Sequence, residues 1–265
     1  YNTGDPEFDY NAIHRMNDLS GNPEVIYWIK YEMGVNNTAN TEAYFSGINY
    51  SGGATKSLVE DYLCTDGLPI TLSPLYQGDE VYEDIFENRD PRLRQTILHP
   101  ADQPFYEYGD HSFEAYAYPR LTGLVGGFFS ETGYHIIKHY RNESAVGSQN
   151  AGTDPAIMIR YAEVLLNYAE AKAELETITQ TDLDMSINQL RDRVAMPHLD
   201  MNNVPVDPRY VNDGVSPLIV EIRRERRIEL FNEGFFRYDD LRRWKQGKKL
   251  EERDYGIRWD DAYQS

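Results

Sequence analysis

Cysteine is almost missing from this sequence, since Cys64 is the only one among its 265 residues. No disulfide can therefore form within the chain. Cys64 lies between Leu63 and Thr65 at the end of an apolar stretch, and we expect it to be a small buried apolar side chain rather than a reactive thiol. The sequence also lacks any run of 18 apolar residues, the length of a membrane-spanning helix.

Basic residues are scarce as well. The 26 Lys and Arg residues face 44 Asp and Glu, which gives a formal net charge of −18. This charge repels nucleic-acid phosphates and anionic lipid, so we expect neutral or cationic partners, no nucleic acid and no basic membrane face. The sequence begins at Tyr1, without a methionine or an apolar signal segment, and we expect it to be a fragment or a processed piece.

Motifs of common enzyme classes are missing too. There is no nucleophile elbow, P-loop, dinucleotide fingerprint or zinc-protease helix, which favours a protein that is not an enzyme. What the chain does contain is a 40% share of apolar residues, enough for one large or two small cores, and 21 tyrosines. Tyrosine combines a flat apolar face with a polar tip, so some of these rings can form a binding surface.

The most informative stretch runs from Ser216 to Trp244. Ser216 can cap a helix and Pro217 suits its first turn. An apolar stripe starts with Leu218, Ile219 and Ile222, but at helical spacing this face continues onto glutamates and arginines. Because a lone buried charge costs several kcal/mol, roughly, these side chains must pair with one another or with a neighbouring helix. We expect a structural ion network that includes Arg224, Glu225, Arg226 and Glu229.

The order of residues here closely resembles the C-terminal signature of the SusD/RagB family, surface glycan-binding lipoproteins of Bacteroidetes nutrient-uptake systems. The matching positions are Arg224, Glu225, Arg226, Arg227, Glu229, Leu230, Glu233, Gly234, Arg237, Asp240, Leu241, Arg242, Arg243 and Trp244. Further segments resemble the family in the expected order. They are TKSLVEDYLCTD (55–66), FENRDPRL (86–93), IRYAEVLLNYAEAKAEL (159–175) and SINQLRDRVAMP (186–197).

The resemblance implies a mainly α fold with tetratricopeptide-related hairpins, a few short strands and long loops. It implies a single C-terminal region over 1–265, with a loop-rich ligand-side part at 20–150 and a helical part at 154–250. The family's N-terminal helical repeats and lipid-anchored cysteine are absent from this sequence. The implied role is capture of an oligosaccharide at the outer face of the outer membrane, capping a TonB-dependent transporter of SusC type.

Local patterns predict the elements. Short helices are expected after Asp5, after Thr55 and over 79–86, strands over 24–31, 92–98 and 133–140, and a turn at 66–67. A hairpin of two helices should follow, capped by Asp154 and Thr181. The first is expected to bury Ile157, Tyr161, Val164, Leu165, Tyr168 and Leu175. The second is expected to bury Leu183, Ile187, Leu190 and Val194. An interhelical network is expected to join arginines of the hairpin and of the 216–244 segment to glutamates. The arginines are Arg191, Arg193, Arg224 and Arg226, and the glutamates are Glu163, Glu170, Glu225 and Glu229.

The stretch 104–129 is rich in aromatic residues but has no helical or alternating period. Either these rings pin a long loop, or several of them form a platform on which sugar rings stack, with polar partners at its edge. The candidate ligand-binding residues are Tyr106, Tyr108, Tyr116 and Tyr118 for stacking, His111 at the edge, and Tyr44 in a second loop.

Three alternatives stay open. Close carboxylate pairs could make the protein a glycoside hydrolase. The helical hairpins could instead form a peptide- or protein-binding scaffold. We expect no cofactor. We also expect no metal on His135 and His139, because these residues would lie about 13 Å apart on a strand at roughly 3.3 Å per residue. A structural calcium ion is an open alternative given the Asp content, although no ligand loop of the right spacing is present.

Overall fold

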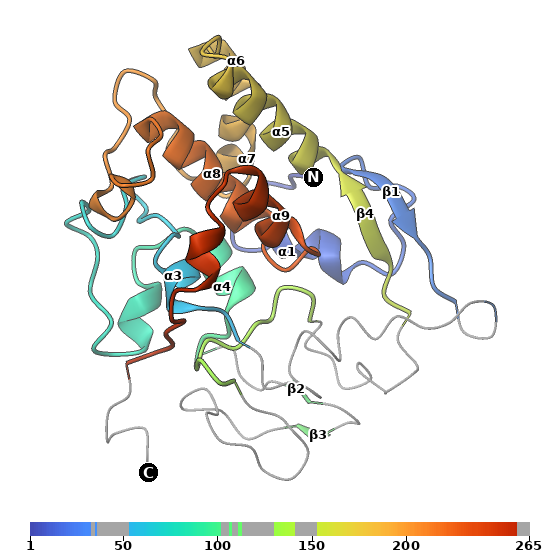
Figure 1. Cartoon of the computed structure of the whole chain (residues 1–265). Coiled ribbons are helices and arrows are strands. Elements are labelled where there is room, and N and C mark those ends of the chain that lie inside the picture. The colour runs from blue at the N-terminus through green and yellow to red at the C-terminus, as the bar shows by residue number, and fades with distance from the viewer. Residues whose placement is uncertain are drawn as a thin grey trace.

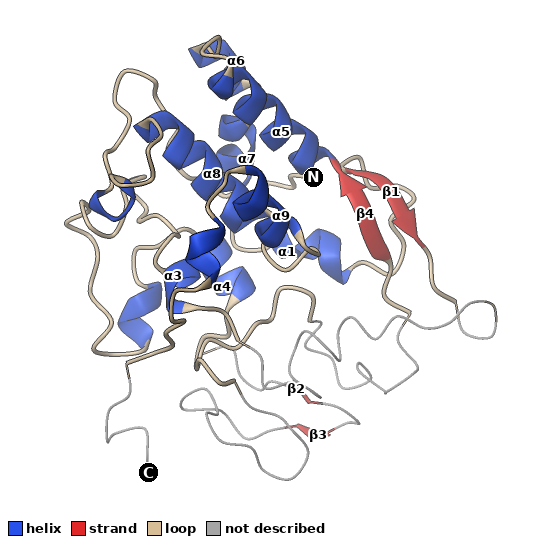
Figure 2. Cartoon of the chain, in the orientation of Figure 1, coloured by secondary structure: helices blue, strands red, loops and turns tan. Residues whose placement is uncertain are grey.

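The computed structural model describes residues 1–32, 35, 53–101, 106–107, 111–112, 130–140 and 153–258, with only the backbone described at 106–107 and 111–112. Within these ranges the chain is mainly helical, with short strands (Figures 1 and 2). The α-helices are α1 (Asp9–Ala12), α3 (Lys56–Val59), α4 (Arg92–Thr96), α5 (Tyr161–Glu174), α6 (Gln180–Asp184), α7 (Ile187–Arg193), α8 (Pro217–Glu229) and α9 (Phe236–Arg243). The 3-10 helices are η1 (Ile13–Arg15), η2 (Glu83–Phe86), η3 (Pro208–Tyr210) and η4 (Gly247–Leu250), and the strands are β1 (Val25–Ile29), β2 (Tyr106–Glu107), β3 (His111–Ser112) and β4 (Ala156–Arg160).

Helix α8 begins as the sequence predicts. The Ser216 hydroxyl accepts a hydrogen bond from the Ile219 N–H at 3.3 Å, and Pro217 occupies the first turn. The last turn is followed by a redirection of the chain at Gly234, where φ is +108°, a conformation that only glycine adopts without strain. Along the buried face, Ile222, Glu225 and Glu229 are each no more than 1% exposed, which confirms that charged residues continue the apolar stripe.

Two hydrophobic cores meet at α8, which crosses the centre of the molecule in Figure 1. Ile222 packs into the core formed with α5, α6 and α7, whereas Ile228 packs into the core formed with α3, η2 and α4. Fully burying one such aliphatic side chain contributes about 1.5 to 3 kcal/mol. The apolar positions of α8 therefore join the upper and lower groups of helices.

The strand predicted over 24–31 is confirmed as β1, and it pairs antiparallel with β4. Register brings Val25 opposite Arg160 and Ile29 opposite Ala156. The prediction that a helix starts after an Asp154 cap is wrong, because the residues that follow Pro155 form β4 and the helix begins only at Tyr161. The Tyr161 N–H donates to the Glu24 carbonyl at 2.7 Å, which fixes the strand-to-helix junction beside β1.

The predicted buried face of α5 was also wrong in most positions. Tyr161, Val164, Tyr168 and Leu175 are 39 to 70% exposed, and the core face is formed instead by Ala162, Leu165, Leu166, Ala169 and Ala173. Helix α5 is thus apolar on two sides. A periodicity argument finds both stripes but cannot tell which one faces this core.

The second helix predicted for the hairpin is divided into α6 and α7, but its predicted core residues Leu183, Ile187, Leu190 and Val194 are buried, as expected. The cap, however, is Thr179 and not Thr181. The Thr179 hydroxyl and the Asp182 carboxylate form a reciprocal capping box, which satisfies two helix-end donors together.

The strand predicted over 92–98 is wrong, since Arg92–Thr96 forms α4. Pro91, with φ −55° and ψ −23°, already has helical angles and starts the turn, and the Leu93 N–H donates to the Asp90 carbonyl. The strand predicted over 133–140 is wrong as well, because only Ile136 forms a bridge, with Ile97. Tight turns at Gly133 and Tyr140 prevent a ladder.

The remaining local predictions hold in outline. A short helix follows Asp5, α3 follows Thr55 and buries Leu58 and Val59, and a turn with positive φ lies at Gly67. Of the helix predicted over 79–86, only the 3-10 helix η2 is formed. Within the described ranges, no helix combines the length and the apolar character that crossing a bilayer requires.

Candidate functional site

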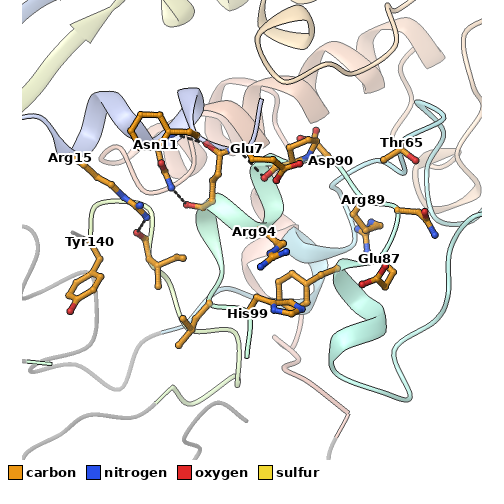
Figure 3. Close-up of a pocket in the computed structure, with 17 residues that line it drawn as sticks. Glu7, Asn11, Arg15, Thr65, Glu87, Arg89, Asp90, Arg94, His99 and Tyr140 are labelled. Carbon is orange, nitrogen blue, oxygen red and sulfur yellow. Dashed lines mark hydrogen bonds between the residues drawn. The ribbon is translucent and has the colours of Figure 1, made fainter. Parts of the chain in front are cut away.

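A pocket of about 880 Å³ lies between α1, α4, residues 86–91 and residues 137–140 (Figure 3). Its lining combines rings, carboxylates, amides and guanidinium groups. In Figure 3, Arg94 and His99 lie in the middle of the view, with Arg15 and Tyr140 at one end and Glu87 and Arg89 at the other. The pocket is adjacent in sequence to the long aromatic segment, because His99 and Tyr140 come shortly before residues 102–129 and 141–152.

Helix α4 supplies both the pocket and the interior with charge. Arg92 is 0% exposed and points inward, whereas Arg94, two residues later, is exposed and lines the pocket. Residues two apart in a helix face nearly opposite sides, while in a strand they share a face. The helical conformation of this segment therefore turns Arg92 into the interior and Arg94 toward the pocket.

Two side chains that line the pocket are hydrogen-bonded to backbone groups and hold its walls in place. Gln95 accepts from the Tyr10 and Asn11 N–H groups at 3.1 and 3.2 Å. Its amide nitrogen donates to the Pro6 carbonyl at 2.9 Å, which ties α4 to the segment before α1. Arg89 donates to the Val59 and Tyr62 carbonyls at 2.7 and 2.8 Å. These residues fix the shape of the pocket rather than its chemistry.

The rim is polar and open to solvent. Burial raises the pKa of Glu7, partly offset by the positive charge of Arg94. Phe8 is 48% exposed, and the rings of Phe86 and His99 meet edge to face with centroids 4.9 Å apart. An exposed ring, that of Phe8, in a pocket lined by amide, guanidinium and carboxylate groups suits a polar ligand that has an apolar face.

Behind the pocket lies a buried ion network, centred on Glu229. Its carboxylate accepts hydrogen bonds from Arg193 at 2.6 and 2.7 Å, from Arg160 at 2.7 Å and from Arg92 at 3.1 Å. These guanidinium groups lower the pKa of Glu229 well below its usual range, against the opposing effect of burial. The residue therefore stays ionised and is surrounded on several sides.

The network extends from Glu229 through further buried pairs. Arg160 also contacts Glu24 at 2.7 Å and Glu233 at 2.6 Å. Lys138 donates to Glu233 and, at 3.0 Å, to the Glu229 carbonyl. Arginine's planar fork suits such multiple carboxylate contacts. Arg92, Arg160, Arg193 and Glu229 come from four separate segments that resemble the family, so the network joins these segments in the fold.

The expected partners of the C-terminal arginines and glutamates are found in part. Arg191 pairs with Glu225 at 3.1 Å and Arg193 with Glu229. Arg224 instead pairs with Asp207 at 2.7 Å, and Arg226 with Asp240 at 2.8 Å. Glu170 is bound by Arg243 and Trp244. Glu225, Glu229, Arg224 and Arg226 are all at most 5% exposed.

The predicted ligand-binding residues lie mostly outside the described part of the chain. Tyr106 and His111 belong to β2 and β3, which pair antiparallel with Tyr106 opposite Ser112 and Glu107 opposite His111. Only the backbone is described there. Tyr44, Tyr108, Tyr116 and Tyr118 fall on residues that the structure does not describe. Stacking by these rings stays a prediction.

No group of three or more His, Cys, Asp or Glu residues with metal-site geometry occurs among the described residues. The ring of His139 meets that of His14, with centroids 4.7 Å apart. Cys64 is 0% exposed, as predicted, and burial raises the pKa of its thiol.

Sequence reasoning missed several of these groups. Glu24, Arg92, Lys138 and Arg160 were not assigned to the network, and Arg94 was not considered for a site. The signal was the Arg-x-Arg spacing after Asp90 and Pro91, which only a helix converts into one inward and one outward charge.

Comparison with known proteins decides the family. The SusD family model matches residues 23–264, nearly the whole sequence. This chain belongs to the SusD family. The mainly helical fold predicted from the family signature is confirmed by the structural matches described next.

Solved SusD-like structures share the fold. A SusD-like carbohydrate binding protein from Bacteroides fragilis matches with a TM-score of 0.65 and 25% identity, over 94% of this chain and 47% of its own. A SusD-like protein from Bacteroides fragilis gives 0.63 and 26%, over 96% and 49%. A SusD superfamily protein from Bacteroides vulgatus gives 0.54 and 19%, over 92% and 45%. The chain thus spans about half the length of these structures. A search of curated proteins gave no match.

Proposed function

We propose that this SusD-family chain is part of a surface glycan-binding protein that captures an oligosaccharide for import. The observation that carries the proposal is the match of almost the whole chain to the SusD family, together with 25% identity to a SusD-like carbohydrate binding protein. SusD-family proteins are binding proteins rather than enzymes. Capture without bond cleavage requires contacts that are individually weak, so that the ligand can be released again.

The pocket beside α4 supports this role. Sugar rings offer C–H faces to aromatic planes and hydroxyls to polar side chains, and the pocket rim contains both kinds of partner. We assign Arg94 and His99 to the edge of the ligand site. Tyr106, Tyr108, Tyr116 and Tyr118 are proposed as the stacking rings and His111 as a further edge partner, with Tyr44 in a second loop.

The proposal extends to the assembly. In the full-length protein, we place this chain at the cell surface of the outer membrane, held by an N-terminal lipid anchor. There it would cap a TonB-dependent transporter of SusC type and pass the ligand on. The partner and the anchor rest on the family resemblance.

A glycan array followed by calorimetry on the full-length protein tests ligand binding. Arg94→Ala should weaken any array hit by roughly tenfold if a charge-assisted hydrogen bond is lost. Arg242→Ala is the matched control, because Arg242 is an arginine 65% exposed on α9 and does not line the pocket. Tyr106→Ala and Tyr116→Ala test the loop separately. Unchanged affinity in the Arg94 variant would exclude this pocket as the ligand site. Unchanged affinity in the tyrosine variants would exclude the loop.

Assays with oligosaccharides and peptides distinguish glycan capture from two other functions. Release of reducing sugar from an oligosaccharide panel would identify a glycoside hydrolase. The carboxylate Asp90 in the pocket lining is already bound by Arg92 at 2.7 Å, which argues against its use as a catalytic acid. Competition by peptides, with no effect of free sugars, would identify a peptide-binding scaffold.

A further inference from the structure

A second pocket, of about 1010 Å³, lies on another part of the molecule and shares no lining residue with the first. It is bounded by α3, the connection from α8 to α9, and residues 249–258 of the C-terminal segment. That segment is fixed in place, because the Lys56 N–H donates to the Tyr255 carbonyl at 2.7 Å and the Ile257 N–H to the Thr132 carbonyl at 2.8 Å. The outer wall is therefore held by backbone hydrogen bonds at two points.

The lining of this second pocket is basic, although the chain as a whole is acidic. Eight of the lining residues are Lys or Arg and five are Asp or Glu, in a chain whose net charge is −18. Most of these cations are neutralised locally. Arg226 pairs with Asp240 at 2.8 Å and Lys249 with Asp213 at 2.6 Å. A surplus of positive charge in a concave site raises the local concentration of anions.

The surplus is centred on two arginines. Among the described residues, neither Arg237 nor Arg253 has a hydrogen-bonded carboxylate partner, and each guanidinium lies near an aromatic ring. Arg237 lies 6.0 Å from the centroid of the Trp244 ring, and Arg253 lies 5.7 Å from that of Tyr255.

Arg237 is the more constrained of the two. It sits in the first turn of α9, is only partly exposed, and lines this pocket as well as a small adjoining one. Burial, together with the nearby charge of Arg227, lowers its pKa to about 10, so the guanidinium is still charged at neutral pH but poorly compensated. A partly desolvated cation of this kind gains from an incoming anion more than a fully solvated one does.

Rings border the same pocket. Tyr255 is 62% exposed, and Phe231 and Phe236 are partly buried in the lining. Guanidinium forks and an exposed aromatic ring in the same pocket suit a ligand that has both a carboxylate and a sugar ring. An inorganic anion would use the fork but not the rings.

We propose that this pocket binds an acidic sugar, with its carboxylate on Arg237, a second contact from Arg253, and its ring against Tyr255. The inference rests on the proposed glycan-binding function and narrows the ligand class to uronic-acid-containing oligosaccharides. No bond is made or broken.

Calorimetry on the full-length protein tests the proposal with three probes of equal length: trigalacturonate, its fully methyl-esterified form, and a neutral galactose trisaccharide. Trigalacturonate should bind at least roughly tenfold more tightly than the other two, as expected for a charge-assisted contact. Arg237→Gln should remove that preference. Arg237→Lys should restore only part of it, because lysine lacks the planar fork.

Arg253→Gln covers the case in which the Arg237 variants do not fold, because Arg253 is exposed. This substitution should weaken trigalacturonate binding several-fold. Free sulfate ions, added as a competitor, test whether the pocket prefers a sugar carboxylate to an inorganic anion. If sulfate displaces trigalacturonate as effectively as galacturonate does, the site is not specific for a carboxylate and the proposal is contradicted. Equal affinity for acidic and neutral sugars, or full trigalacturonate binding in Arg237→Gln, would overturn the acidic-sugar proposal and leave glycan binding standing. Binding of none of the three probes, with no array hit, would instead count against the proposed function itself.

Discussion

Replacement of Glu229 by glutamine is the perturbation that the buried ion network makes most informative. The Glu229 carboxylate is 0% exposed and accepts from Arg92, Arg160 and Arg193 at 2.6 to 3.1 Å. Glutamine keeps the volume and one acceptor oxygen. It removes the negative charge and places an NH₂ group against guanidinium donors, which cannot accept hydrogen bonds from it.

The expected cost is large relative to total stability. Removing one partner of a buried ion pair costs about 3 to 5 kcal/mol, because the opposite charge stays buried without compensation. Here Arg160 and Arg193 keep Glu24 as a second partner, at 2.7 and 3.3 Å. We therefore expect a loss near the lower end, about 3 kcal/mol, from a total that is about 5 to 15 kcal/mol for a typical domain.

Urea unfolding, followed by circular dichroism, measures the loss in free energy of unfolding. Glu174→Gln is the matched control, since Glu174 is 47% exposed and pairs with Arg223 at 2.9 Å. Exposed pairs contribute about 0 to 1 kcal/mol, so the control should change little. A Glu229→Gln variant as stable as the control would refute the view that this network holds the elements together.

Two further predictions concern pH and backbone. Burial lowers the pKa of His14 to about 3 and of His139 to about 4, below the ordinary 6.5, so protons bind the unfolded chain first and stability falls as pH drops below about 6.5. Between pH 7 and 5, each histidine should lower the free energy of unfolding by about 2 kcal/mol. Urea titrations at the two pH values should show a loss that is smaller by this amount in His14→Gln. The same pH profile in His14→Gln and in the unchanged protein would contradict the assignment. Gly133→Ala should lower the free energy of unfolding by about 1 to 2 kcal/mol, because φ is +78° and the new methyl would meet Ile257. Gly21→Ala, with nothing within 4 Å, should not, and equal stability of the two variants would count against the strain.

The sequence predicts the C-terminal helices well because their signals are local. The cap of α8, its proline and the charged continuation of its apolar stripe all lie within one segment. The core positions of α7, such as Ile187 and Leu190, follow from helical spacing alone. Short elements are harder. Helix α4 spans only five residues and starts because Pro91 already has helical angles. The pattern of apolar residues does not show this.

The site is less predictable than the fold because it is assembled from distant residues. Arg92 and Glu229 meet across a separation of 137 residues, which no local pattern reports. The outward face of Arg94 follows only once α4 is known to be a helix. On α5 the choice of the buried stripe depends on where α8 packs, which the sequence of α5 alone does not show.

Recovery of a bound oligosaccharide is the measurement that tests the central claim most directly. The full-length protein would be incubated with the strongest array hit, its dissociation constant measured by calorimetry, and the sugar released and weighed by mass spectrometry. We expect saturable binding and a sugar recovered with its mass unchanged after many hours. Shortened products, or no saturable binding of any oligosaccharide, would contradict a protein that captures glycans intact.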